Sequence, residues 1–68
     1  SGFDLNQLIC LEALLTERNV TGASERMHLS QSAMSTIFGQ LRTHFADPLL
    51  VRSGRVMVLT PIARSLVA

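Results

Sequence analysis

The chain has 68 residues, of which 47% are hydrophobic and 16% are charged, and its formal net charge is +1. A chain of this length supports one hydrophobic core, which excludes a second domain, and its apolar content excludes a disordered segment. The single cysteine excludes an internal disulfide, two separated histidines predict no metal site, and no apolar run could span a membrane, so we expect a cytoplasmic protein without metal or cofactor.

Two helices are predicted in the first part of the chain. The first runs from about Leu5 to Arg18, with Asp4 as its N-cap. Its apolar stripe consists of leucines at three- and four-residue spacings: Leu5, Leu8, Leu11, Leu14 and Leu15. A shorter helix follows, with Thr21 as its N-cap and its end near Met27.

A third helix is predicted from Ser30, its N-cap, to about Phe45, because Asp47 and Pro48 then interrupt the pattern. A short helix, a turn of a few residues and a longer helix form a helix-turn-helix arrangement. The longer helix is then the recognition helix, which in DNA-binding proteins of this kind enters the major groove.

The remaining residues predict a hairpin and a fourth helix. Residues Leu49–Leu59 are rich in leucine, valine and methionine on both sides of Ser53-Gly54, which predicts a two-stranded β wing. Thr60 and Pro61 then provide an N-cap and a proline at the first helical position. We therefore divide the chain into a domain over residues 1–59 and the start of a further helix over residues 60–68.

The predicted third helix has two contrasting faces. Its core face consists of the apolar residues Met34, Ile37, Phe38, Leu41 and Phe45. The opposite face consists of small polar residues and glycine, namely Ser32, Ser35, Thr36, Gly39 and Thr43, with Gln31 and Arg42 on its flank. Such residues weaken a helix but allow its backbone to approach base edges and phosphates closely. The alternatives are a tolerated polar surface and a seam for helix packing.

Charge is distributed unevenly along the chain. Residues 1–34 have a balance of −2 and residues 35–68 a balance of +3, and every cation is arginine. Arginine suits bidentate contact with phosphate or guanine. We interpret Arg52 and Arg55, on either side of Gly54, as DNA contacts of the wing, with ordinary hairpin charges as the alternative.

Several other residues have a purely structural interpretation. Cys10 lies in an apolar segment and is predicted to be buried, since a reactive thiol needs exposure and nearby positive charge. His28 and His44 are interpreted as cap or surface residues, because no further ligands accompany them. Glu12 and Glu17 are interpreted as part of a solvated face.

Three segments of the chain match a known pattern. Residues 20–35, VTGASERMHLSQSAMS, resemble the helix-turn-helix in the N-terminal domain of LysR-type bacterial transcriptional regulators. Residues 47–52, DPLLVR, with Gly54-Arg55 and the LTP of residues 59–61, resemble their wing and the start of their linker helix. The residues DLN at 4–6, Leu41-Arg42 and Phe45 resemble the branch that contains nodulation activators and regulators of aromatic degradation.

The resemblance implies a mainly α winged helix-turn-helix fold, with a three-helix core, a short two-stranded β wing and the start of a linker helix. It implies a homodimer formed through the linker helix, in a longer protein with a small-molecule effector domain. Residues that match positions meeting base edges and phosphates are Gln31, Ser32, Ser35 and Thr36. Arg52 and Arg55 match wing positions near the backbone and minor groove, and Thr21 matches a helix start that touches phosphate.

Four positions depart from the family pattern. Ser24 replaces a second alanine and Met27 replaces leucine, which are both packing changes. Thr36 replaces a frequent arginine, which removes strong guanine recognition at that position. Ser32 replaces a frequent proline and leaves Gln31 less restricted.

Two hypotheses about function follow. The first is sequence-specific binding of an inverted-repeat operator in double-stranded DNA by a dimer, in which Leu66 and Val67 belong to the dimer interface. The second is a helix-turn-helix that serves protein association alone, which the low net charge favours. An enzyme is not predicted, since the chain has no paired acid and base, activated nucleophile or phosphate-binding loop.

Overall fold

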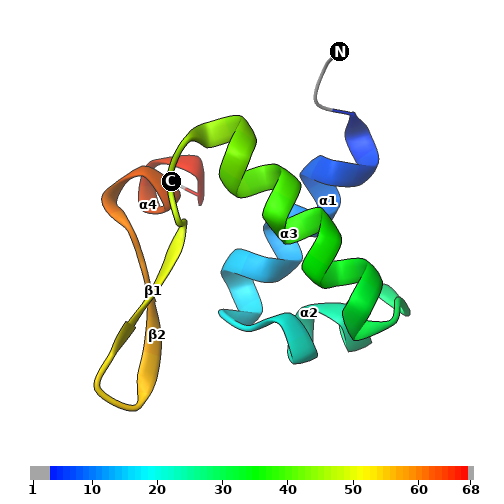
Figure 1. Ribbon diagram of the computed structural model, residues 1–68, viewed down its shortest axis with the longest axis horizontal. Coiled ribbons are helices and arrows are strands. Elements are labelled where there is room, and N and C mark those ends of the chain that lie inside the picture. The colour runs from blue at the N-terminus through cyan, green and yellow to red at the C-terminus, as the bar shows by residue number, and fades with distance from the viewer. Residues whose placement is uncertain (1–3, 68) are drawn as a thin grey trace.

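The computed structural model describes residues 4–67 and contains four helices and one two-stranded antiparallel sheet in the order α1-α2-α3-β1-β2-α4. The elements are α1 Leu5–Glu17, α2 Val20–Met27, α3 Gln31–Phe45, β1 Leu50–Ser53, β2 Val56–Leu59 and α4 Pro61–Val67. The helices α1, α2 and α3 pack together, and the hairpin projects from them with α4 beside its base (Figure 1). The predicted mainly α winged helix-turn-helix is therefore confirmed.

Local capping interactions explain where the helices begin. Asp4 accepts a hydrogen bond from the backbone N–H of Gln7 at 2.8 Å, and Ser30 accepts one from Ala33 at 3.0 Å. These two caps confirm the sequence prediction.

The predicted start of the second helix was wrong by two residues. Its N-cap is Asn19, whose side-chain Oδ1 accepts from the N–H of Gly22 at 2.6 Å, whereas Thr21 lies inside the first turn. Asparagine and threonine both cap helices, and only the backbone conformation decides between two neighbouring candidates.

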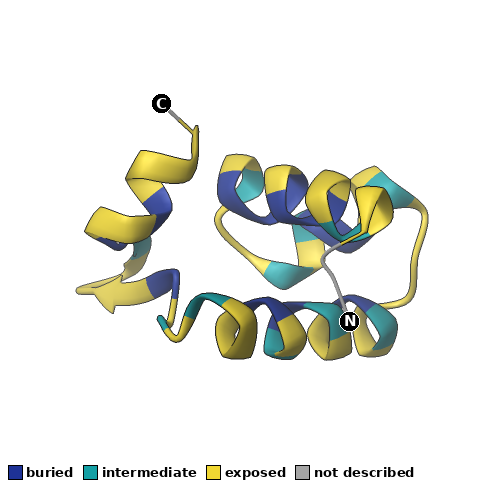
Figure 2. Cartoon of the chain, turned by 90° about the horizontal axis from the view of Figure 1, so that it is seen from above, coloured by how far each residue is buried: buried dark blue, intermediate teal, exposed yellow. Residues whose placement is uncertain are grey.

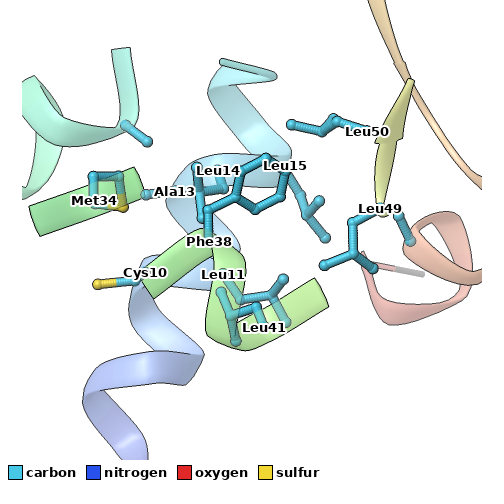
Figure 3. Packing of buried hydrophobic residues seen from close by; sticks show 12 residues of the cluster. Cys10, Leu11, Ala13, Leu14, Leu15, Met34, Phe38, Leu41, Leu49 and Leu50 are labelled. Carbon is cyan, nitrogen blue, oxygen red and sulfur yellow. The ribbon is translucent and has the colours of Figure 1, made fainter. Parts of the chain in front are cut away.

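The core lies between α1 and α3, with the base of the hairpin closing one end (Figure 3). Figure 2 shows that the helices carry buried residues on the sides that face one another and exposed residues on their outer sides. The side chains of Leu14, Met34 and Leu41 are completely buried. Ile37 and Phe45 are partly buried against the same cluster, so the predicted core face of the third helix is confirmed.

The predicted leucine stripe of the first helix is correct only in part. Leu11, Leu14 and Leu15 are buried, but Leu5 is 71% exposed and Leu8 is 50% exposed. Cys10 is the first buried residue of α1, so the core covers only the later part of this helix.

The base of the wing is held by one carboxylate. Asp47 Oδ2 accepts hydrogen bonds from the backbone N–H of Leu49 at 2.8 Å and from the hydroxyl of Thr60 at 2.6 Å. The Thr60 hydroxyl in turn accepts from the N–H of Ala63 at 3.1 Å, which makes it the predicted cap of the fourth helix. One side chain thus connects the end of α3, the hairpin and the start of α4.

The predicted hairpin began at Leu49, but β1 begins one residue later because the backbone of Leu49 is left-handed, with φ of 66°. The N–H of Leu50 donates across it to the carbonyl of Pro48 at 2.7 Å, which forms a three-residue turn. A left-handed leucine costs roughly 1–2 kcal/mol. Complete burial of its side chain and the hydrogen bond to Asp47 offset that cost.

Cys10 is buried as predicted, with its side chain in the cluster between α1 and α3 (Figure 3). Burial raises the pKa of its thiol above the ordinary value, and the nearby Asp4 carboxylate raises it further. Because the thiolate is the reactive form, we expect the folded chain to resist a maleimide at neutral pH and to be labelled rapidly once unfolded in urea. Mass spectrometry of timed samples measures this, and rapid complete labelling of the folded chain would contradict the buried position.

Candidate nucleic-acid interface

The helix-turn-helix is formed by α2, a turn at residues 28–30 and α3. His28 adopts a left-handed conformation, with φ of 57°, and the N–H of Leu29 donates to the carbonyl of Ser24 at 2.9 Å. One residue in this conformation is enough to end a helix and redirect the chain. His28 is therefore a helix cap, as predicted.

The second helix is fixed against the first by a close approach at Gly22. A Cβ atom built there would lie 3.0 Å from the Glu17 carboxylate and 3.2 Å from the side chain of the N-cap Asn19. Glu17 also forms an ion pair with Arg26 at 3.2 Å. Glu17 is partly exposed, so the solvated face predicted for it is correct only in part, because its carboxylate also joins α1 to α2.

The outer face of α3 presents the residues that the sequence predicted for it. The exposed members are Gln31, Ser32, Ser35, Thr36, Arg42 and Thr43, while Gly39 is partly buried. Ser30 lies exposed at the N-terminus of the helix and Thr21 is exposed in the first turn of α2. In Figure 1, the tip of the hairpin lies at the lower left and the N-terminal end of α3 at the lower right.

The hydroxyl groups on this face are not equally available. Thr36 donates to the carbonyl of Ser32 and Thr43 donates to the carbonyl of Gly39, both at 3.1 Å. These two hydroxyls therefore use their protons within the helix and can only accept from a ligand. Within residues 4–67, no hydrogen bond engages the hydroxyl of Ser32 or Ser35, so both can donate and accept.

Packing within the domain does not explain why position 39 of α3 is a glycine. A Cβ atom built there meets no other atom within 4 Å, whereas one at Gly22 lies only 3.0–3.2 Å from side-chain atoms of Glu17 and Asn19. The surroundings therefore leave little room for a side chain at position 22 and place no such limit on position 39. A partner molecule that approaches the backbone of α3 closely would favour a residue without a side chain at position 39.

This contrast gives a prediction about stability. Gly39→Ala should raise the free energy of unfolding by about 0.5–1 kcal/mol, because alanine loses less backbone entropy in a helix. The same variant should bind DNA more weakly, since the added methyl group stands on the outer face. Urea denaturation and a binding titration measure the two effects, with Gly22→Ala, whose added methyl group would lie 3.0–3.2 Å from Glu17 and Asn19, as a control that gains less stability. Tighter binding by Gly39→Ala would contradict close backbone approach.

The arginines of the wing occupy different places on the hairpin. Arg52 is exposed in β1 and pairs in register with Met57, on the side of the hairpin that also carries Leu50 and Leu59. Arg55 is exposed beside the left-handed Gly54 in the turn between the strands. Within residues 4–67, no carboxylate forms an ion pair with either arginine, so both remain uncompensated cations.

A second surface consists of apolar side chains on α1 and α4. Leu8, Ile9, Leu66 and Val67 line a shallow groove between the two helices and are 39–52% exposed. Apolar residues gathered on a small domain typically mark a contact with another chain. This groove is separate from the outer face of α3.

Other candidate chemistry is limited. Among residues 4–67, no three His, Cys, Asp or Glu side chains are grouped to hold a metal ion, and no helix is both long and apolar enough to cross a bilayer. His44 and Glu12 are exposed, as predicted for surface residues, and the His44 ring packs edge-on against Phe45.

Two features escaped the sequence analysis. Phe38 supports the guanidinium of Arg42, whose central carbon lies 4.4 Å from the ring centroid. Their spacing of four residues on one helix could have indicated this contact. Asp47 was interpreted only as a residue that ends the third helix. Its hydrogen bond with Thr60 joins residues thirteen positions apart, so no local sequence pattern predicts it.

The family model for bacterial regulatory helix-turn-helix proteins of the lysR family matches residues 5–64. The chain belongs to this family. Among LysR relatives, Nodulation protein D 1 of Rhizobium tropici is 52% identical over 67 residues, which cover 98% of this chain and 22% of that protein. Nodulation protein D 1 of Neorhizobium galegae is 51% identical over 65 residues, which cover 96% of this chain and 21% of that protein.

Solved structures agree with this assignment. A probable transcriptional regulator from Pseudomonas aeruginosa superposes with a TM-score of 0.84 at 39% identity, over 94% of this chain and 22% of that one. The CbnR DNA-binding domain, solved in complex with DNA, superposes with a TM-score of 0.77 at 27% identity, over 93% of this chain and 72% of that one. The chain is a LysR-type helix-turn-helix DNA-binding domain, and it spans about a fifth of the length of its nodulation-protein relatives.

Proposed function

We propose that this LysR domain binds double-stranded DNA sequence-specifically, with α3 in the major groove and the β wing beside the minor groove. The observation that carries the proposal is the outer face of α3, where exposed hydroxyl groups surround a glycine that the fold itself does not need. A helix whose outer face is small and polar can lie close to base edges. The CbnR complex, formed by a relative with the same fold, supports this arrangement.

Individual roles follow from position along α3. Gln31 lies exposed in the first turn, where its amide can pair bidentately with adenine. Ser32, Ser35 and Thr36 follow on the same side and offer hydroxyls to bases and phosphates. Thr43 extends this face toward the C-terminal end of the helix.

Contacts with the phosphate backbone surround this face. Ser30 and Thr21 lie at the starts of α3 and α2, where free backbone N–H groups favour an anion. Arg52 and Arg55 on the wing, and Arg42 on α3, supply cations without an ion-pair partner in the described part of the chain. Arginine near the minor groove is favoured by its negative potential.

The apolar groove between α1 and α4 supports a homodimer. Leu66 and Val67 would pack against a second copy, in a linker helix that continues from residues 60–68. Ala63 is completely buried, so α4 begins as part of the packed domain and presents its remaining apolar side chains outward. Two-fold symmetry would place two copies of α3 on half-sites about one helical turn apart, in an inverted-repeat operator.

The rest of the regulator lies outside this chain. Because the relatives are about five times longer, we propose that an effector-binding domain follows and that the whole protein regulates transcription in the cytoplasm. No enzymatic step is proposed for the domain, and the proposed function invokes no metal or cofactor.

A second candidate function is protein association without DNA. The apolar groove and the net charge of +1 favour it, since DNA-binding domains are commonly more basic. The two functions predict different results with the same sample. A domain that self-associates but binds no duplex, even at low salt, would have this second function.

The deciding experiment is a titration against a duplex selected from a random library and against a scrambled version of it. At one fixed salt concentration, the selected duplex should bind more tightly by about 1000-fold or more in a complete dimer, with a smaller ratio for the isolated domain. Equal affinities for the two duplexes would remove the claim of specificity.

A further inference from the structure

The guanidinium of Arg42, at the flank of α3, packs against the aromatic ring of Phe38 and not against a carboxylate. The guanidinium carbon of Arg42 lies 4.4 Å from the centroid of the Phe38 ring, one turn earlier on α3. Phe38 is itself 9% exposed and anchored in the core. Among residues 4–67, Arg26 forms an ion pair with Glu17, and no carboxylate lies within ion-pairing distance of Arg42.

The choice of partner matters for the chemistry of the cation. A carboxylate would occupy the N–H fork of the guanidinium and neutralise its charge. An aromatic face attracts the cation through its quadrupole and restricts its rotamers, while the N–H groups at the edge of the guanidinium remain free to donate. The Phe38 ring therefore orders Arg42 and leaves its charge and its donors available.

The position of Arg42 along the helix indicates what it would meet. Gln31, Ser35, Phe38 and Arg42 follow one another at spacings of three or four residues, so they form one ridge along the flank of α3. Arg42 lies eleven residues after Gln31, or about 16 Å along the axis at 1.5 Å per residue. The major groove is about 12 Å wide, so a helix with Gln31 at a base edge carries Arg42 to the phosphates of the groove wall.

We infer that Phe38 is a positioning residue that holds the guanidinium of Arg42 ready to contact a DNA phosphate. This inference rests on the proposed function and adds a role to a residue that otherwise belongs to the core. Ordering a long side chain before binding lowers the entropy lost on binding. The contribution of the ring corresponds to about a two- to tenfold gain in affinity.

A double-mutant cycle tests the inference with a labelled mixed-sequence duplex. Arg42→Ala should weaken binding to every duplex and lower the slope of affinity against salt by about one. Phe38→Leu, which keeps an apolar side chain but removes the ring, should weaken binding about two- to tenfold. In the Arg42→Ala background, Phe38→Leu should cause no further loss. Equal losses in both backgrounds would overturn the inference, because they would indicate a purely structural role.

Two controls separate positioning from folding. Phe45→Leu removes a partly buried ring from the same helix and should leave duplex affinity unchanged in a sample that circular dichroism shows to be folded. Phe38→Met is a second ring-free variant in case leucine unfolds the domain. Ring-current shifts of the Arg42 side-chain protons in the unaltered chain report the stack directly, and their absence would overturn the inference.

The failure of the inference differs from the failure of the proposed function. If Arg42→Ala binds as tightly as the unaltered chain while the selected duplex is still preferred over the scrambled one, then only the phosphate contact is overturned. If the unaltered chain binds no duplex at low salt, both are overturned.

Discussion

Leu14→Ala is expected to remove a large share of the stability of the domain, while the same substitution at Leu5 leaves the stability almost unchanged. Leu14 is completely buried between α1 and α3, and removing its side chain leaves a cavity that costs about 2–5 kcal/mol. A domain of this length has a total free energy of unfolding of roughly 3–10 kcal/mol. One substitution therefore removes a large share of the stability.

Leu5→Ala provides the matched control on the same helix. Its side chain is 71% exposed, so the change should alter the free energy of unfolding by less than about 0.5 kcal/mol. Urea denaturation followed by circular dichroism measures both variants. Equal losses of stability would mean that the N-terminal turn of α1 is covered in solution by another chain.

Gln31→Ala is expected to produce the largest change in DNA specificity. If its amide pairs with a base edge, its removal should cost about 1–3 kcal/mol against the selected duplex and almost nothing against a scrambled one. The ratio of the two affinities would then fall by about five- to 150-fold. Parallel titrations at one salt concentration measure this ratio.

Arg55→Ala is the complementary variant, because a contact with phosphate carries no sequence information. We expect it to weaken both duplexes by similar factors and to lower the salt slope by about one. An unchanged slope would contradict contact between the wing and the backbone. A Gln31→Ala variant that weakens both duplexes equally would move Gln31 from base recognition to phosphate contact.

The helix boundaries were largely predictable because helix ends are determined by neighbours in sequence. Asp4 and Ser30 cap their helices through hydrogen bonds to the residue three positions later, and Thr60 does the same before Pro61. Asn19 was missed in favour of Thr21, since both residue types cap helices and the choice depends on the backbone. The hairpin was predictable for a similar local reason, the turn at Gly54.

The candidate interface was predictable in its location but not in its chemistry. Helical periodicity placed the small polar residues on one side of α3, and the structure exposes them there. The same periodicity could not show that Thr36 and Thr43 use their hydroxyl protons on backbone carbonyls. Side-chain rotamers make that difference, and they have no counterpart in the pattern of residue types.

By itself, the sequence determined the helix-turn-helix, the wing and the polar face of α3, because each depends on interactions between residues a few positions apart. Only the tertiary structure decided which leucines of α1 are buried, since burial depends on what packs against the helix. It also decided that Asp47 joins the wing to α4 through the hydroxyl of Thr60, thirteen residues away. Contacts between residues distant in sequence form only when the whole chain is folded. The periodicity and spacing of residue types therefore do not predict them.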